Sequence, residues 1–399
     1  MIDKIISRNK AQCTGCTACY SACPVSAITM QSDAEGFLYP SVDYNQCIRC
    51  GLCKKICPTV GEVPGPCDEA FEVEAYAAYN KDSDIRFRSS SGGIFSLMAE
   101  EILAQNGAVF GAAMGDDMVV RHIKVENLED LEKLRGSKYV QSALGDSFSS
   151  CKEMLENGRI VLFSGTPCQI GGLKSYLGKE YENLYTVDII CHGVPSPLVW
   201  KKYVEEESAA SPITSVSFRC KSAGWKNFRF RIERKNGDFS EEDVWHNPFV
   251  AGFLSNLYLR KSCYECSFKL LHRCSDMTIA DFWGVDKIMP ELYDDLGTSL
   301  LFIHNLQGRL MLRKIGNGMV MEKAPITSAV EQNNAMIESV GMHKKREIFF
   351  REMMETESGI IALIKKHAVN HSLRKRISLA LRSKLRSIFK SKNKFPSKS

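Results

Sequence analysis

The pattern of apolar and polar residues divides the chain into a cysteine-rich front and a longer body. Behind about residue 70, short apolar runs typical of buried strands alternate with segments whose apolar residues have helical spacing. The strand-like runs are residues 74–79, 108–113, 159–163 and 184–190, and the helical segments are residues 92–105, 148–156 and 169–176. This alternation predicts an α/β body around a largely buried mixed or parallel sheet.

Two later stretches depart from this alternation. Residues 215–244 alternate apolar and polar side chains around Asn236-Gly237, a pattern that predicts antiparallel hairpin strands. Beyond about Ser328 the chain is mostly polar and predicted to be helical.

The front of the chain is an internal repeat. Residues 13–58 are dense in cysteine and turn residues, with a strand-like segment at residues 37–39 between the two halves. The Pro-Gly-Pro at residues 64–66 marks a linker. A chain of 399 residues exceeds the usual size of one domain, so two or three domains are expected.

The chain contains sixteen cysteines, and their chemistry depends on the compartment of the protein. The chain has no apolar signal segment at its start and no apolar window of the roughly 18 residues that a spanning helix needs. We therefore expect a cytoplasmic protein, in which thiols stay reduced. The cysteines are then expected to bind metal or carry redox chemistry.

Charge is distributed unevenly along the chain. The net charge is +5, but residues 365–399 hold twelve Lys or Arg and no acid, so the rest of the chain is net acidic. This argues against a nucleic-acid-binding body. Apolar residues recur in the tail at helical spacing, as in a basic interfacial helix, so a peripheral membrane or an anionic partner is a candidate contact. These residues are Leu373, Ile377, Leu381, Leu385, Ile388 and Phe389.

The repeat at the front gives the most specific signal. Both copies read C-x2-C-x2-C-x3-C-P, a spacing in which three thiolates of one run bind one 4Fe-4S cluster and the fourth reaches the other cluster. One cluster is therefore assigned to Cys13, Cys16, Cys19 and Cys57, and the other to Cys47, Cys50, Cys53 and Cys23. Zinc is the rival, but a zinc ribbon uses two distant CxxC pairs.

A second set of cysteines lies in the body. Cys168 and Cys191 each follow a predicted strand, and Cys263 and Cys266 have CxxC spacing. These four are predicted to hold a third cluster, with Cys274 as the competing fourth ligand in place of Cys168. The remaining cysteines, Cys67, Cys151 and Cys220, are interpreted as small apolar residues.

Several loops are candidates for binding an anionic cofactor. Ser91, Gly92 and Gly93 precede a predicted helix, where backbone N–H groups favour a phosphate, although an ordinary helix cap reads the same way. Lys138 beside Gly136 offers a cation, or is a surface charge.

Five motifs occur in the body between about residues 75 and 330: GSKYVQS, SGTPCQIGGL, ICHGVPSPLVW, CYECSFK and SDMTIADFWGV. Together they resemble those of the family of coenzyme F420 hydrogenase/dehydrogenase beta subunits. Characterised branches of that family are flavoproteins with iron-sulfur clusters. They include F420-reducing hydrogenase subunits and chlorophyll-type vinyl or hydroxymethyl reductases. The dicluster domain is similar to that of members often encoded near surface-polysaccharide biosynthesis genes.

The resemblance implies FAD and a set of residues that line it. At the matching positions these are Ser91, Gly92, Gly93, Ser137, Lys138, Gln141, Ser142, Thr166, Pro167 and Gln169. It also implies that Cys168, Cys191, Cys263 and Cys266 hold the cluster nearest the flavin. Asp281 in DFWG and His192 in CHG are the candidate catalytic residues, although His192 also reads as a structural histidine.

These expectations define the organisation of the chain. An α+β ferredoxin-like dicluster domain, residues 1–66, is fused to an α/β flavin-binding domain. The N-terminal part of that domain spans residues 67–155 and its C-terminal part residues 156–330. A helical region with a basic tail follows, residues 331–399.

The predicted function is an electron relay. A soluble partner such as ferredoxin exchanges single electrons with the N-terminal clusters, and FAD gathers two for F420 or another small-molecule substrate. The alternative is a carrier subunit that hands electrons to a partner enzyme.

Overall fold

The computed structural model describes residues 9–61, 71–356 and 358–368. The predicted linker at residues 64–66, Cys67 and the basic tail from residue 369 lie outside these ranges. In the part that is described, no helix is long and apolar enough to cross a membrane.

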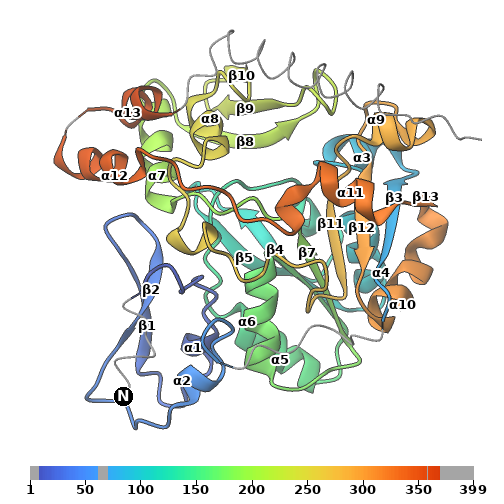
Figure 1. Cartoon of the computed structure of the whole chain (residues 1–399), viewed down its shortest axis with the longest axis horizontal. Helices are drawn as coiled ribbons and strands as arrows, with labels where there is room; N and C mark the ends of the chain where they lie inside the picture. The colour runs from blue at the N-terminus through green and yellow to red at the C-terminus, as the bar shows by residue number, and fades with distance from the viewer. Residues whose placement is uncertain (1–8, 62–70, 357, 369–399) are drawn as a thin grey trace, which may run out of the picture.

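The N-terminal unit is a small domain at the edge of the body (Figure 1). A two-stranded antiparallel hairpin joins two short helices, each of which lies within one cysteine run. The elements are α1 Ala18–Ser21, β1 Ile28–Ser32, β2 Leu38–Val42 and α2 Leu52–Lys55.

The two cysteine runs repeat their backbone as well as their spacing. Thr17 and Gly51 occupy the same place after the second cysteine, and both have a positive φ, 61° and 74°. Gly15 and Arg49, one place before that cysteine, also have positive φ, 72° and 56°. Non-glycine residues pay a steric cost at positive φ. The positive φ of Thr17 and Arg49 therefore indicates that the curled path of each cysteine run overrides the backbone preference of these two residues.

The body is organised around one mixed eight-stranded sheet in the order β13-β3-β12-β11-β7-β6-β4-β5. Its strands are β3 Glu74–Asn80, β4 Ala108–Met114, β5 Val120–Val125, β6 Val161–Gly165, β7 Leu184–Ile189, β11 Met277–Asp281, β12 Ser299–Ile303 and β13 Met319–Lys323. Strands β4, β6, β7 and β11 run parallel, and the remaining pairs are antiparallel. The sequence prediction of a mixed sheet is confirmed.

Alternate residues of the strands face opposite sides of the sheet, and both sides are covered. Val109 packs into one core with α4 and α10, whereas Ala108 and Phe110 pack into another with α5 and α6. The covering helices are α3 Ser83–Arg88, α4 Ile94–Ala104, α5 Ser147–Glu156, α6 Pro167–Leu177, α9 Val285–Ile288, α10 Leu306–Ile315 and α11 Ile326–Gln332, with short 3-10 turns η2 Asp130–Leu134, η4 Pro290–Leu292, η5 Gly316–Gly318 and η6 Asn334–Met336.

A second layer lies above one end of the sheet (Figure 1). It contains the predicted hairpin strands as a three-stranded sheet, β8 Ile213–Cys220, β9 Arg229–Arg234 and β10 Phe239–Asp243, and the helices α7 Pro197–Glu207, α8 Pro248–Leu254, α12 Arg346–Glu355 and α13 Ile360–His367, with the turn η3 Lys261–Cys263. These elements share an aromatic-rich core around Trp200, Tyr203 and Phe249.

The N-terminal domain packs on the body through two of these cores. Phe37 of its hairpin is fully buried in the core of the second layer. Cys16 and Ala18 join the core of α5 and α6. At Gly172 of α6, an added Cβ would lie 2.9 Å from the Cys16 sulfur, so the glycine permits a close approach of the first cysteine run.

Candidate functional site

The first cysteine set gathers around a small enclosed space. A cavity of about 40 Å³ is lined by Cys13, Cys16, Cys19 and Cys57, together with Cys53, residues of the two cysteine runs and residues of the hairpin. Burial, with smaller contributions from the neighbouring Cys13 and Cys57, raises the pKa of Cys16 to about 12. Thiols that repel one another when ionised favour a cationic metal centre as their common partner. We refer to this group as the inner set.

The inner cavity also carries polar atoms without partners. The hydroxyl of buried Thr17 lines this cavity and has no hydrogen-bond partner among the described residues. The hydroxyl of Tyr39 nearby is also buried and unpaired in the described part of the chain. Buried hydroxyls are normally satisfied, so these donors fit the acceptor sulfurs of a bound cluster.

The second set gathers in the same way but nearer to solvent. The pKa of Cys53 is raised by burial and then by the charges of Cys50, Cys47 and Cys23. Cys50 is exposed, whereas Cys16 is buried. We refer to these four cysteines as the outer set. The structure therefore brings together the two sets that the crossed spacing predicts.

A third set of four cysteines lies in the body. Burial raises the pKa of Cys168 well above its ordinary value, and Cys266, Cys191 and Cys263 raise it further. All four thiols line one wall of a larger cavity. Cys274 does not line it and instead packs at the edge of the α5 and α6 core.

The spacing of these thiols is wider than a single ion requires. Across the described ranges, no three His, Cys, Asp or Glu side chains are grouped closely enough to hold one metal ion. The thiolates of a four-iron cluster each bind a different iron, so they stand further apart than the ligands of zinc. The donor chemistry and the enclosed spaces both fit clusters.

The larger cavity has a volume of about 580 Å³ and lies where the parallel strands β6, β7 and β11 end. This volume is within the roughly 300–1,000 Å³ of small-molecule and cofactor pockets. The loops after the carboxyl ends of parallel strands are the usual ligand site of α/β sheets. Nine of the ten residues that the sequence predicts around the flavin line this cavity: Ser91, Gly93, Ser137, Lys138, Gln141, Ser142, Thr166, Pro167 and Gln169.

Gly92 is the exception. It lies behind the cavity wall, where an added Cβ would stand 2.5 Å from the Ala78 carbonyl oxygen. Its N–H donates to the Ser299 hydroxyl at 2.9 Å. Gly92 therefore holds the loop against β12 and contributes to the site through its neighbours.

The cavity is positively charged. Its lining contains five Lys or Arg residues and two carboxylates, and both carboxylates are paired with arginine. Loss of water lowers the pKa of Lys138 to about 7, and its ammonium donates to the carbonyls of Lys133 and Arg135. The side chain is half-buried, and Lys138 is one of the residues that line the cavity. Such a wall fits an anionic ligand.

The two serine-containing loops at the cavity are joined to each other. The Ser137 N–H and hydroxyl both contact the Ser90 hydroxyl, at 2.7 and 2.9 Å. Gly93 has φ 80° and begins α4, and Thr166 begins α6 with Pro167 in its first turn. Both helix starts line the cavity, and the positive N-terminal end of a helix suits phosphate oxygens.

A buried histidine supports the loop that carries Cys168. The ring of His122 contacts the Ser164 carbonyl oxygen through Nε2 at 2.9 Å and the Ser142 hydroxyl through Nδ1 at 2.8 Å. Gln169 donates to the same hydroxyl at 3.0 Å. Burial lowers the pKa of His122 to about 4, so the ring is neutral and can donate at one nitrogen and accept at the other.

The two candidate catalytic residues are both engaged by neighbours. Asp281 binds the guanidinium of Arg219 through two bonds of 2.6 and 2.8 Å and accepts the indole N–H of Trp225 at 2.7 Å. His192 donates to the Asn256 side-chain oxygen at 2.6 Å, and burial lowers its pKa. Both side chains line the cavity, and their catalytic role stays a prediction.

Sequence reasoning missed the arginines of this site. Arg219 has a side chain only 4% exposed, stacks 3.9 Å from the Phe228 ring, and its buried Nε has no partner among the described residues. Arg135 and Arg260 also line the cavity. The one available signal for Arg219 was a charged residue at the end of a β-strand pattern, and this does not separate a buried arginine from an edge residue.

The fold and the site together define an iron-sulfur protein whose cluster-binding domain is fixed to an α/β body with a cofactor-sized basic cavity. Residues 12–60 match the 4Fe-4S dicluster domain. Residues 75–147 and 158–329 match the N-terminal and C-terminal parts of the beta subunit of coenzyme F420 hydrogenase/dehydrogenase. These two regions cover more than half of the chain. The chain belongs to the family of coenzyme F420 hydrogenase/dehydrogenase beta subunits.

Two individual relatives are each less than 30% identical to this chain. The coenzyme F420-dependent sulfite reductase of Methanocaldococcus jannaschii is 29% identical over 199 residues, which are 48% of this chain and 29% of that protein. A component of the F(420)H(2) dehydrogenase of Methanosarcina mazei is 24% identical over 168 residues, which are 39% of this chain and 46% of that protein. The chain thus spans less than half the length of each of these relatives.

One solved structure is also similar. A chain of the F420-reducing [NiFe] hydrogenase complex from Methanosarcina barkeri aligns with a TM-score of 0.43 and 18% identity, covering 65% of this chain and 89% of that one.

Proposed function

We propose that this chain is an iron-sulfur flavoprotein oxidoreductase that relays electrons between a soluble partner and a small-molecule substrate, F420 or a compound of similar chemistry. The observation that carries the proposal is the convergence of nine predicted flavin-lining residues and four cysteines on one basic cavity. When bound, the clusters supply one-electron transfer and FAD couples it to a two-electron reduction.

Different residues of the chain would bind the clusters and FAD. The inner and outer cysteines would hold the two clusters of the dicluster domain, and Cys168, Cys191, Cys263 and Cys266 a third. The position of Cys274 away from the cavity supports Cys168 as the fourth ligand. Lys138, Arg219 and the helix starts at Gly93 and Thr166 would bind the phosphates of FAD.

The geometry supports a positioning role for Asp281. Both oxygens of its carboxylate accept from Arg219, and one also accepts from Trp225, so the carboxylate is held as the counter-ion that orients the guanidinium. His192 keeps one ring nitrogen, Nδ1, outside the bond to Asn256, and because Nε2 carries the proton of the neutral ring, His192 is the better candidate proton acceptor.

The test is the cofactor content of the protein purified without oxygen. We expect an extractable FAD and about twelve irons per chain, the number that three four-iron clusters contain. The substrate would then be tested by mixing the reduced protein with F420 and monitoring the loss of the visible absorption of F420. About eight irons and no flavin would contradict the proposal and favour a carrier subunit that serves a partner enzyme.

A further inference from the structure

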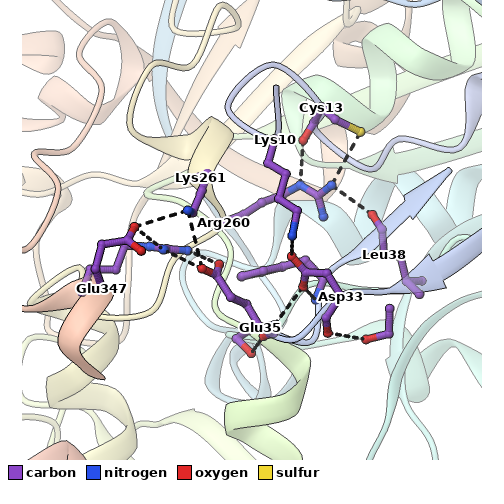
Figure 2. Close-up of polar contacts among 12 residues, drawn as sticks. Lys10, Cys13, Asp33, Glu35, Leu38, Arg260, Lys261 and Glu347 are labelled. Atoms are coloured by element: carbon purple, nitrogen blue, oxygen red, sulfur yellow. Dashed lines mark hydrogen bonds and ion pairs between the residues drawn. The ribbon is translucent and has the colours of Figure 1, made fainter. Parts of the chain in front are cut away.

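Arg260 joins the body to the inner cysteine set. It lies just before η3 and is completely buried, with 0% of its surface exposed. Its Nε donates to the Cys13 carbonyl oxygen at 2.8 Å, and one terminal nitrogen lies 3.6 Å from the Cys13 sulfur. The other terminal nitrogen donates to Gln141 at 3.1 Å. Figure 2 shows the guanidinium reaching between Cys13 and Leu38 of the N-terminal domain.

The charge of Arg260 has no carboxylate partner in the described part of the chain. The nearby acids are already paired, Glu35 with Arg346 and Asp33 with Lys10 (Figure 2). The guanidinium instead lies 4.2 Å from the centre of the Tyr39 ring. An unpaired buried charge costs several kcal/mol, so a negative group is expected at the open side of this site.

The sulfur of Cys13 identifies that negative group. Thiolates and sulfides give a cysteine-bound cluster a negative charge that grows by one on reduction. A hydrogen-bond donor and a cation beside the sulfur stabilise the reduced state, and both are known levers on cluster potential. The charge of Arg260 also lowers the pKa of Cys263, although burial raises it more strongly to about 12.

The outer set has no equivalent cation among the described residues. The residue in the outer run that corresponds to Gly15 is Arg49, and Arg49, Lys54 and Lys55 are exposed, so water screens their charges. Gly15, in contrast, packs against Arg260, because an added Cβ would lie 2.9 Å from its guanidinium nitrogen. The glycine of the inner run thus makes room for the arginine.

We propose that Arg260 raises the reduction potential of the inner cluster above that of the outer cluster, so that an electron entering from solvent settles beside the body. The inference rests on the proposed cluster content. The step is a one-electron reduction in which the soluble donor is oxidised and no bond forms or breaks. Arg260 acts on the cluster as a positioning and electrostatic residue.

The experiment is a redox titration of the whole protein followed by electron paramagnetic resonance. In Arg260→Gln we expect one of the two dicluster potentials to shift to a more negative value while the other stays unchanged. Arg260→Lys keeps the charge but loses the planar fork, so a smaller shift in the same direction is expected. Cys50→Ser removes the outer signal and shows which potential moved.

Lys261→Gln is the matched control. Lys261 is the next residue, also a cation, and pairs with Glu35 and Glu347 away from the cysteines. Its loss should leave both potentials in place. Unchanged potentials in Arg260→Lys and Arg260→Gln with normal iron content would overturn the inference and leave the proposed function standing. Absence of iron from the unaltered protein would overturn the proposed function itself.

Discussion

The inner and outer cysteine sets share a spacing and a backbone but differ in their surroundings. The inner set includes the buried Cys16, which packs against α6, and it contacts Arg260 and lies beside the Thr17 hydroxyl, which has no partner among the described residues. The outer set includes the exposed Cys50 and is flanked by solvated cations. Two copies of one motif can thus acquire different roles through what the rest of the chain packs against them.

The largest difference is expected when a ligand is removed from each set. Cys19→Ser and Cys50→Ser should each lose about four irons per chain. Cys19→Ser should also destabilise the protein by more than about 4 kcal/mol, because the buried metal site supports the contact with the body. Iron analysis and urea unfolding measure both effects. Cys151→Ala removes a buried cysteine with no predicted ligand role, so this variant should keep the full iron content of the protein. A full iron content in Cys19→Ser would contradict the ligand assignment.

The next difference concerns the ion pair that fixes the N-terminal domain. Arg346 of α12 is 0% exposed and binds Glu35, which is 10% exposed, at 3.0 Å (Figure 2). Glu35→Gln should cost about 3–5 kcal/mol, since it leaves a buried arginine with only the exposed Glu347, at 3.3 Å, as a carboxylate partner. Lys366→Gln, which breaks an exposed pair with Glu352, should cost at most about 1 kcal/mol. Equal midpoints of chemical unfolding for the two variants would show that this contact does not hold the domain.

The contrast between buried and exposed sites extends to the lysines of one loop. With a pKa of about 7, Lys138 should be charged below that pH, so binding of pyrophosphate should weaken by more than tenfold as pH rises from 6 to 8.5, a loss of about 1.5–3 kcal/mol. Lys138→Met should bind weakly at every pH. Lys133→Met, which removes an exposed cation, should keep the pH profile. Calorimetric titration measures the affinities.

The same lysine has a consequence for stability. Its folded pKa is lower than the ordinary 10.5, so the unfolded chain binds more protons between about pH 7 and 10.5. The contribution of Lys138 therefore makes the empty protein more stable as pH rises through this window. The difference in unfolding free energy between the unaltered protein and Lys138→Met should change accordingly with pH, and a constant difference would contradict the lowered pKa.

The smallest effect is expected at the contact of α6 with the inner run. Gly172→Ala should destabilise by about 1–2 kcal/mol, because the new Cβ would lie 2.7 Å from that of Cys16 and outweigh the helical gain from alanine. Gly316→Ala places a methyl group in open space and should be neutral or slightly stabilising. Thermal unfolding of the two variants compares them directly.

The features that could be predicted from the sequence are those set by local spacing. The crossed pairing of Cys23 and Cys57 follows from the run itself, and Cys168 and Cys191 were found from their places after strands. Arg260 could not be found in this way. It stands beside Lys261 in an ordinary basic stretch, and only the tertiary contact with Cys13 separates a buried counter-charge from a surface pair.

The position of β3 in the sheet could not be predicted from the sequence either. Its apolar pattern predicts a strand, but its neighbours are β12 and β13 from the far end of the body. The partners of a strand are set by packing that involves the whole chain.

That strand order also governs how the chain can be made. Tyr79 pairs with Val320, so β3 cannot pair with its neighbours until most of the polypeptide has left the ribosome. A fragment ending near residue 155 would expose both edges of β3. The synthesis of such a protein therefore includes an interval in which an unpaired strand needs protection from aggregation.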